Sequence, residues 1–290
     1  MSKDTEKDID EVTGTDTTGH TWDGIKELNN PLPRWWLWTF YLTIIWGIGY
    51  TIAYPAWPLI SGATPGVLGY STRGEVAEDI ARFEEANAEI SAQLAAADLN
   101  QLSENPELMR YANSAGAAVF LTGCAQCHGS GAAGAVGYPN LLDDDWLWGG
   151  DFDSIEYTIR HGIRNEEDWD ARYSQMTAYD EIFSNDEVDQ VVQYVRQISG
   201  QEYDMALASD GEELFLNSCA ACHGDNGQGN RDLGAPNLAD AIWLYGGDTA
   251  SLEDSVRYAR FGVMPAWGER LSEAEIKAVT AYVHQLGGGE

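Results

Sequence analysis

Two copies of the pattern Cys-x-x-Cys-His constrain this chain more than any other feature. The copies are Cys124, Cys127 and His128, then Cys219, Cys222 and His223, and they use all four cysteines of the sequence. Cysteines three residues apart on one helical turn face the same side, so each thiol can form a thioether to one vinyl group of a haem. The histidine that follows can then present an imidazole nitrogen to the iron. The two motifs therefore predict two covalently bound haem c groups.

Other chemistries use similar spacings. A single Cys-x-x-Cys also occurs in zinc sites, in thioredoxin-like redox sites and in disulfides. A histidine directly after the second cysteine, in both copies, favours haem attachment over these alternatives. Because haem takes every cysteine, we expect no structural disulfide.

The part of the chain that carries the motifs is an internal duplication. Residues 116–121 match residues 211–216 at an offset of 95, and the haem motifs follow at the same offset. Further matches are Pro139-Asn140-Leu141 with Pro236-Asn237-Leu238, and Trp146-Leu147-Trp148-Gly149-Gly150 with Trp243-Leu244-Tyr245-Gly246-Gly247. Arg160 matches Arg260, and the first copy then carries about 12 extra residues, Arg164–Gln175. Each copy resembles the cytochrome c fold: helix, haem motif, Gly-rich loop, middle helix, Met loop and a final helix crossing the first.

Each haem iron needs a sixth ligand or an open site. Met176 and Met264 occupy equivalent Met-x-Ala-aromatic positions, 48 and 41 residues after the motif histidines. A thioether stabilises ferrous iron and suits electron transfer, so both are predicted axial ligands beside His128 and His223. The sequence leaves open whether each methionine serves the haem of its own copy or of the other.

The remaining candidates are interpreted as non-ligands. Met109 and Met205 precede their motifs and are interpreted as core filler. His161 is the alternative sixth ligand for the first haem, but its counterpart is Phe261, so a surface or propionate-contacting role is expected. The paired aromatic residues near 146 and 243 are expected to wall the haems, although they could instead donate to propionates.

One segment is typical of a membrane span. Residues 35–72 contain no charged residue, and Trp35–Tyr54 is strongly apolar. Twenty helical residues extend about 30 Å, the thickness of a bilayer core. Tryptophans at the start, and Tyr54 and Trp57 at the end, resemble the aromatic belts of membrane helices. A cleaved signal peptide is the alternative, but the run is long, begins late and lacks a small-residue cleavage site.

The flanking charges predict an orientation. Lys26 and Arg34 precede the span, whereas the first base after it is Arg73. The positive-inside rule then places the N-terminus in the cytoplasm and the haem domains outside. We therefore expect a single-pass protein of the bacterial inner membrane with periplasmic haem domains.

These observations predict an all-α chain with one N-terminal transmembrane helix and two tandem cytochrome c-type domains. The expected parts are a cytoplasmic segment (1–33), whose first 20 residues look disordered, and a transmembrane helix (34–57). A periplasmic connector with an amphipathic helix (58–107) and cytochrome c domains at 108–200 and 201–290 follow. The apolar stripe of the connector helix could pack on its own domain or on a partner subunit.

The charge restricts the partners. The formal net charge is −31, and residues 73–290 hold 12 bases and 39 acids. Nucleic acid is excluded as a partner because no basic patch could neutralise phosphates. The acidity indicates either a solvated surface or electrostatic attraction of a basic partner, and both can hold.

A family resemblance rests on the N-terminal segment. The run from Asp23-Gly24-Ile25-Lys26 to Pro33-Arg34-Trp35-Trp36 resembles the signature of the dihaem subunit III (CcoP/FixP-like) of cbb3-type cytochrome c oxidases. The haem motifs and Met loops also fit, and the resemblance covers about residues 21–290. It implies a complex with a haem–copper catalytic subunit and a monohaem cytochrome c subunit. It also implies electrons arriving from a bc1 complex or a soluble cytochrome c, and no oxygen-reducing site in this chain.

Two other functions are consistent with the motifs. A free membrane-tethered dihaem shuttle would be purified without the oxidase subunits. A dihaem peroxidase would need one iron with an open or displaceable sixth ligand.

Overall fold

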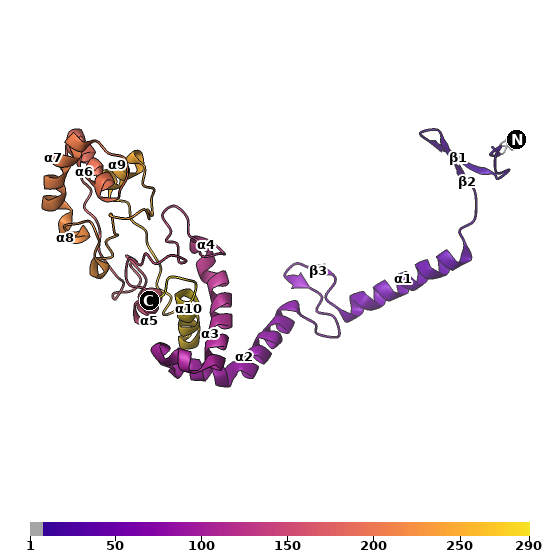
Figure 1. Ribbon diagram of the computed structural model, residues 1–290. Coiled ribbons are helices and arrows are strands. Elements are labelled where there is room, and N and C mark those ends of the chain that lie inside the picture. Colours follow the sequence, from indigo (N-terminus) through magenta and orange to yellow (C-terminus); the bar gives the residue numbers. More distant parts are fainter. Residues whose placement is uncertain (1–7) are drawn as a thin grey trace. The chain divides into compact units, whose positions relative to one another are not determined.

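The computed structural model describes residues 8–290 (Figure 1). The chain divides into two compact units, residues 1–85 and 86–290, which are described separately.

The first unit begins with a small β-hairpin. Strand β1 (Thr17–Trp22) pairs antiparallel with β2 (Ile25–Leu28), and Asp23 and Gly24 form the turn with φ of 49° and 85°. Two successive residues of positive φ match the twist of a tight hairpin. The expectation of disorder is therefore wrong for residues 17–20, because strand pairing orders this polar segment. Residues 1–7 of that expectation lie outside the described residues.

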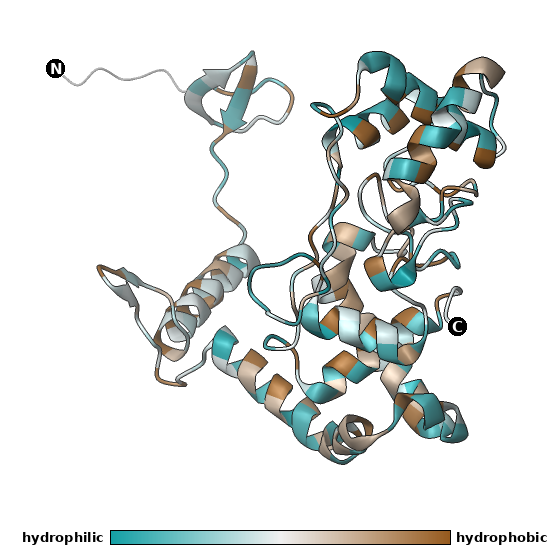
Figure 2. Ribbon diagram, turned by 90° about the vertical axis from the view of Figure 1, so that its left-hand side faces the viewer, coloured by the Kyte–Doolittle hydropathy of each residue, from teal (hydrophilic) through white to brown (hydrophobic). Residues whose placement is uncertain are grey.

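The apolar segment forms one uninterrupted helix. Helix α1 (Arg34–Ala53) is 20 residues long, and every one of its residues is at least partly exposed. Its length and composition suffice to cross a membrane. Figure 2 shows brown and pale residues along α1, whereas the following helix α2 (Thr72–Ala96) alternates teal and brown. Tyr54, directly before Pro55, is extended and ends α1, as expected of a residue preceding proline.

A second hairpin follows α1. Strands β3 (Pro58–Leu59) and β4 (Gly62–Ala63) pair antiparallel within the segment expected to be an irregular connector. Helix α2 then crosses from the first unit into the second. Its last turns pack there, where Leu94 is fully buried and Lys277 donates to the carbonyls of Ala95 and Ala97.

The second unit is helical, and the predicted all-α fold class is confirmed apart from the small hairpins. Its elements are η1 (Leu99–Glu104), α3 (Pro106–Val119), the π-helical turn η2 (Phe120–Cys124), α4 (Ala125–His128), α5 (Phe152–His161), α6 (Asn185–Ile198), α7 (Met205–Ser218), α8 (Ala220–His223), η3 (Arg231–Leu233), α9 (Thr249–Tyr258) and α10 (Glu273–His284). Capping boxes begin α6 and α10, as the Ser-x-x-Glu patterns predict.

The first and final helices cross closely, but their partners come from opposite copies of the repeat. Helix α3 packs against α10, and α7 packs against α6. A Cβ placed on Gly116 of α3 would lie 2.1 Å from the carbonyl oxygen of Ala278. A Cβ on Gly211 of α7 would lie 2.0 Å from that of Gln190. Glycine is therefore required at both crossings.

Aromatic pairs accompany both crossings. The rings of Phe120 and Tyr282 lie 5.4 Å apart, and those of Tyr194 and Phe215 lie 5.1 Å apart. Each pair joins a residue of one copy to a residue of the other. The sequence predicted this kind of crossing, and the structure adds that the copies exchange their final helices.

Two interleaved bodies result. What we call the first body comprises residues 99–163 with 264–290, and the second body comprises residues 176–258. The core of the first body contains Phe120, Ile155 and Ile276, and that of the second contains Phe215, Val192 and Leu252. The second body is thus inserted between two segments of the first.

The two non-ligand methionines differ in environment. Met109 packs partly buried beside Leu94 and Leu108, as expected of core filler. Met205 is 76% exposed, so the core-filler prediction is wrong there. It is the first residue of α7, directly after the capping Asp204.

Candidate haem-binding site

Each haem motif occupies one short helical turn. Cys124 ends η2, and Cys127 and His128 lie in α4. Gly129, with φ of 79°, ends the turn, and Gly224, with φ of 78°, ends the equivalent α8. This left-handed conformation favours glycine and directs the chain away after each histidine.

Both histidines are held in the same tautomer. Nδ1 of His128 lies 3.0 Å from the carbonyl oxygen of Pro139, and Nδ1 of His223 lies 3.0 Å from that of Pro236. A carbonyl can only accept, so Nδ1 carries the proton and donates, and Nε2 keeps its lone pair for a metal. Both prolines belong to the Pro-Asn-Leu segments that match between the two copies. The sequence did not indicate that their carbonyls accept from the histidines.

The electrostatic environment supports neutral imidazoles. Burial lowers the pKa of His128 and of His223, more than the bonds to Pro139 and Pro236 raise them. Neutral imidazole is the form that ligates iron. The histidines therefore fit haem ligation in both donor geometry and protonation.

The cysteines are available for thioethers. All four lie in the described range, and none forms a disulfide there. Burial raises the pKa of the Cys124 and Cys219 thiols to about 11, whereas Cys127 and Cys222 are exposed. Each motif thus places one thiol against the hydrophobic core and the other at the surface. This arrangement fits a haem attached where the core meets the surface.

The second methionine loop lies beside the first haem motif. Met264 packs on the same core as Cys124, and its backbone exchanges hydrogen bonds of 2.9 and 3.0 Å with Ile163. The Trp267 ring lies against Gly123, where an added Cβ would come within 2.8 Å of the indole. The fold therefore brings Met264 together with Cys124 from the other copy.

The first methionine loop lies beside the second haem motif. Met176 packs on the core that contains Cys219 and Phe215. The Tyr179 hydroxyl donates to the carbonyl of Ser218 at 2.6 Å, directly before Cys219. Tyr179 and Trp267 are equivalent in the two Met loops, so both aromatic residues contact the residue that precedes a motif of the opposite copy.

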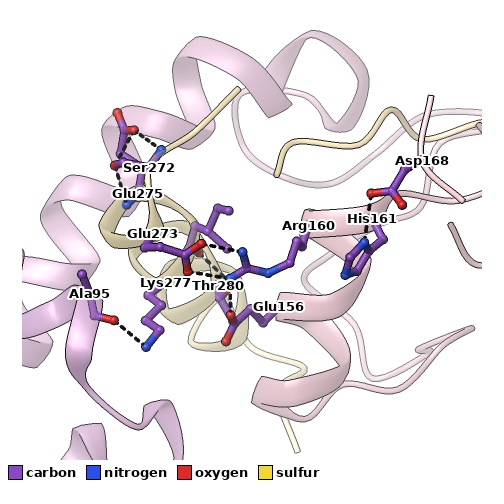
Figure 3. A network of polar contacts seen from close by, with 11 residues as sticks. Ala95, Glu156, Arg160, His161, Asp168, Ser272, Glu273, Glu275, Lys277 and Thr280 are labelled. Atoms are coloured by element: carbon purple, nitrogen blue, oxygen red, sulfur yellow. Dashed lines mark hydrogen bonds and ion pairs between the residues drawn. The ribbon is translucent and has the colours of Figure 1, made fainter. Parts of the chain in front are cut away.

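His161 is engaged elsewhere. It ends α5, and its Nδ1 lies 2.9 Å from a carboxylate oxygen of Asp168 (Figure 3). Its ring also packs against Tyr157. Asp168 and Tyr157 are thus its neighbours in the structure, and its role as a non-ligand stays a prediction.

The two tryptophans of the pair in the first copy have different surroundings. Trp146 packs on the core of the first body, and its indole nitrogen donates to the carbonyl of Gly288. Trp148 is 8% exposed, and its Nε1 is buried without a hydrogen-bond partner among the described residues. Arg172, in the extra segment, also has a buried Nε without a partner. Sequence reasoning missed Arg172, because the second copy has no aligned residue.

Three family models match successive parts of the chain. The N-terminal domain of cytochrome oxidase-cbb3, FixP, matches residues 14–61, and cytochrome c matches residues 114–199. Cytochrome C oxidase, cbb3-type, subunit III matches residues 206–283. The chain thus carries the N-terminal domain of this subunit type followed by two cytochrome c domains.

Curated relatives match nearly the whole chain. The cbb3-type cytochrome c oxidase subunit CcoP of Cereibacter sphaeroides is 62% identical over 276 residues, covering 94% of this chain and 95% of the relative. The CcoP subunit of Rhodobacter capsulatus is 54% identical and covers 94% and 96%. The FixP subunit of Azorhizobium caulinodans is 52% identical and covers 97% and 96%.

Local geometry and relatives agree on the cofactor. Two cytochrome c domains with neutral, correctly oriented histidines and unpaired cysteines hold two covalently bound haem c groups. Helix α1 fits a membrane anchor. The chain therefore belongs to the CcoP/FixP family, the haem c-carrying electron-transfer subunits of cbb3-type cytochrome c oxidases.

Proposed function

We propose that this chain receives electrons from a bc1 complex or a basic cytochrome c. It then passes them through a monohaem subunit to the haem–copper subunit that reduces oxygen. The bound haem supplies reversible one-electron chemistry, and the protein supplies ligands, burial and position. The family shows that the chain belongs to an oxidoreductase complex. The specific partners named here are our proposal.

The proposed attachment residues are Cys124 and Cys127 for one haem and Cys219 and Cys222 for the other. We propose crossed axial pairs, His128 with Met264 and His223 with Met176. The observation that carries this proposal is the exchange of final helices and Met loops between the copies, which puts each methionine on the core of the opposite motif. The sequence boundaries at 108–200 and 201–290 then describe repeats, and each haem is held by parts of both.

Filled axial positions restrict the chemistry. With a methionine and a histidine on each iron, neither haem offers a site for oxygen or peroxide. We therefore propose that this chain relays electrons and does no oxygen chemistry itself. The same reasoning disfavours the peroxidase alternative.

The proposed location follows from the charges around α1. Lys26 precedes the helix and Arg34 is its first residue, which favours a cytoplasmic N-terminus and periplasmic haem domains in the bacterial inner membrane. A tag placed at each end, tested for protease access in intact spheroplasts, distinguishes this orientation from its reverse.

Affinity purification through this chain tests the assignment. We expect the haem–copper and monohaem subunits to copurify with it from gently solubilised membranes. Recovery of the haem-loaded chain alone, from membranes with active cbb3 oxidase, would support the free shuttle instead.

Methyl-labelled methionine tests the crossed pairing in the full haem-loaded chain. A ligating methyl group lies in the ring current of its haem, so we expect two strongly shifted signals in the reduced protein, lost separately in Met176→Leu and Met264→Leu. Nuclear Overhauser contacts should join the Met264 methyl to the haem bonded to Cys124. Contacts to the haem bonded to Cys219 would contradict the crossed pairs.

A further inference from the structure

The extra segment of the first copy exposes a tryptophan. Trp169 is 103% exposed, and Tyr173, four residues later, is 72% exposed. The other tryptophans of residues 86–290 are buried or partly buried. Burial of a large aromatic side chain is favourable, and aromatic residues are enriched where proteins bind one another. A fully exposed tryptophan in an inserted segment is thus a candidate anchor for a partner.

The turn that carries Trp169 is held on both sides. Before it, the side-chain oxygen of Asn165 accepts from the backbone N–H of Asp168 at 3.0 Å. After it, the Tyr157 hydroxyl donates to the carbonyl of Asp170 at 2.9 Å. The backbone around Trp169 is therefore fixed before any partner arrives, which lowers the entropy lost on binding.

The residues next to Trp169 are acidic. Residues 165–171 contain no base and four carboxylates, those of Glu166, Glu167, Asp168 and Asp170. Arg270 pairs with the second of these and His161 with the third (Figure 3). Glu166 and Asp170 are exposed and form no ion pair among residues 8–290. Such a surface repels anionic lipid headgroups and haem propionates, and it attracts a partner that is rich in lysine.

The extra segment is bonded to the second methionine loop. Ile163 exchanges backbone hydrogen bonds with Met264 and pairs with Arg172 on its other side. Arg172 comes three residues after Trp169. Val263, directly before Met264, is 57% exposed. The exposed surface of the segment is therefore only a few residues from a proposed axial ligand.

We propose that Trp169 anchors the docking site of a small, lysine-rich electron-donor protein, with Glu166 and Asp170 at the rim. This deepens the proposed function and rests on it, because the donor gives up one electron and thereby reduces the haem whose proposed ligand is Met264. Complexes between redox proteins bury little surface, so one central aromatic residue can carry much of their affinity. The rim carboxylates guide the approach of the basic partner and fix its orientation.

Binding of a lysine-rich cytochrome c to the full haem-loaded chain tests the anchor. Both proteins are kept oxidised, so calorimetry at low salt measures affinity without electron transfer. We expect Trp169→Ala to weaken binding at least about tenfold. Trp169→Phe, which keeps an aromatic ring, should recover part of the affinity. Ile182→Ala is the matched control and should change little, because Ile182 is exposed beside Asp180 and Glu181 in the second body.

Removal of the rim charges tests the role of the carboxylates. In surface plasmon resonance at low salt, Glu166→Gln with Asp170→Asn should slow association and flatten its dependence on salt, while dissociation stays nearly unchanged. Glu84→Gln with Glu85→Gln is the control, because it removes two exposed carboxylates from α2. Equal slowing in the two double variants would show that only net charge matters and would contradict the docking site.

Three results of the binding experiments would overturn the inference. The first is unchanged affinity in a stably folded Trp169→Ala protein, and the second is an equal loss in Ile182→Ala. The third is loss of the copurifying oxidase subunits in Trp169→Ala with donor affinity retained, which would identify this surface as a subunit contact.

The proposed function fails in a different way. An unsubstituted chain that copurifies with oxidase subunits but binds no basic cytochrome c would overturn the docking site together with the basic donor proposed above. A purified chain without covalent haem would contradict the proposed function itself, and the docking inference with it.

Discussion

Asp145 shows how a single half-buried carboxyl group limits stability. Burial, followed by the charges of Asp240 and Asp143, raises the pKa of its carboxyl from 3.8 to about 6. The folded chain therefore holds this proton up to a higher pH than the unfolded chain. Stability contributed by the protonated group is present below about pH 4 and is lost as pH rises towards 6.

Asp145→Asn should remove the loss of stability that the ionised Asp145 carboxylate causes above about pH 6. Two pKa units correspond to about 3 kcal/mol, and solvent screening of a half-exposed group reduces this to roughly 1 kcal/mol. We expect denaturant unfolding to show a gain of about that size at pH 7.5 and almost none at pH 4. An equal gain at both pH values would show that the carboxyl charge is not responsible.

At the scale of helices, the crossings of α3 with α10 and of α7 with α6 depend on glycine. Gly116→Ala would place a methyl group 2.1 Å from the Ala278 carbonyl oxygen, so the helices must separate. We expect a loss of about 1–3 kcal/mol in the free energy of unfolding. Gly131→Ala is the control, because an added Cβ there meets nothing within 4 Å. Equal stability of the two variants would contradict the close crossing.

The helices that are exchanged also depend on their caps. The Ser184 hydroxyl accepts from the N–H of Glu187 at 3.3 Å, and the Glu187 carboxylate accepts from the N–H of Ser184 at 2.8 Å. Ser184→Ala should lower the thermal stability of α6 by about 1 kcal/mol, and Ser184→Asp should restore most of it. Calorimetry of the three proteins checks this. If Ser184→Asp lost as much stability as Ser184→Ala, the Ser184 hydroxyl would contribute through packing rather than through capping.

At the scale of the whole molecule, the exchange of segments couples the two bodies. The second body lies between the two chain segments of the first, and each helix crossing uses both copies. We therefore expect one cooperative unfolding transition, with methionine ligation lost at both haems together. Gly116→Ala should lower the midpoint for both haems, although it touches only the first body. Two separate transitions would indicate independent domains.

The surface charge of the whole chain predicts a salt dependence. With a net charge of −31 the protein should attract a basic donor, and the Debye length falls from about 10 Å at 0.1 M to about 3 Å at 1 M salt. Reduction by a lysine-rich cytochrome c should slow as ionic strength rises. Reduction by a neutral small-molecule donor is the control and should stay nearly constant. Equal responses of both donors would argue against electrostatic attraction.

The sequence by itself determined most of the features that depend on short spacings. The Cys-x-x-Cys-His motifs, the Met loops, the capping boxes and the 20-residue apolar helix each follow from neighbours along the chain, so local geometry sufficed. The repeat also revealed the glycine and aromatic residues of the helix crossings. Hairpin pairing in residues 17–28 escaped prediction because its polar composition outweighed the Asp-Gly turn signal.

Only the tertiary structure decided which copy each final helix serves. Both copies carry the same glycine, aromatic and capping residues at the crossings, so either pairing satisfies the pattern. The choice depends on how residues distant in sequence pack together. The same holds for Arg172, whose segment has no counterpart to align. Its position beside Trp148 depends on backbone hydrogen bonds with Gly162 and Arg164, which no match between the two copies could reveal.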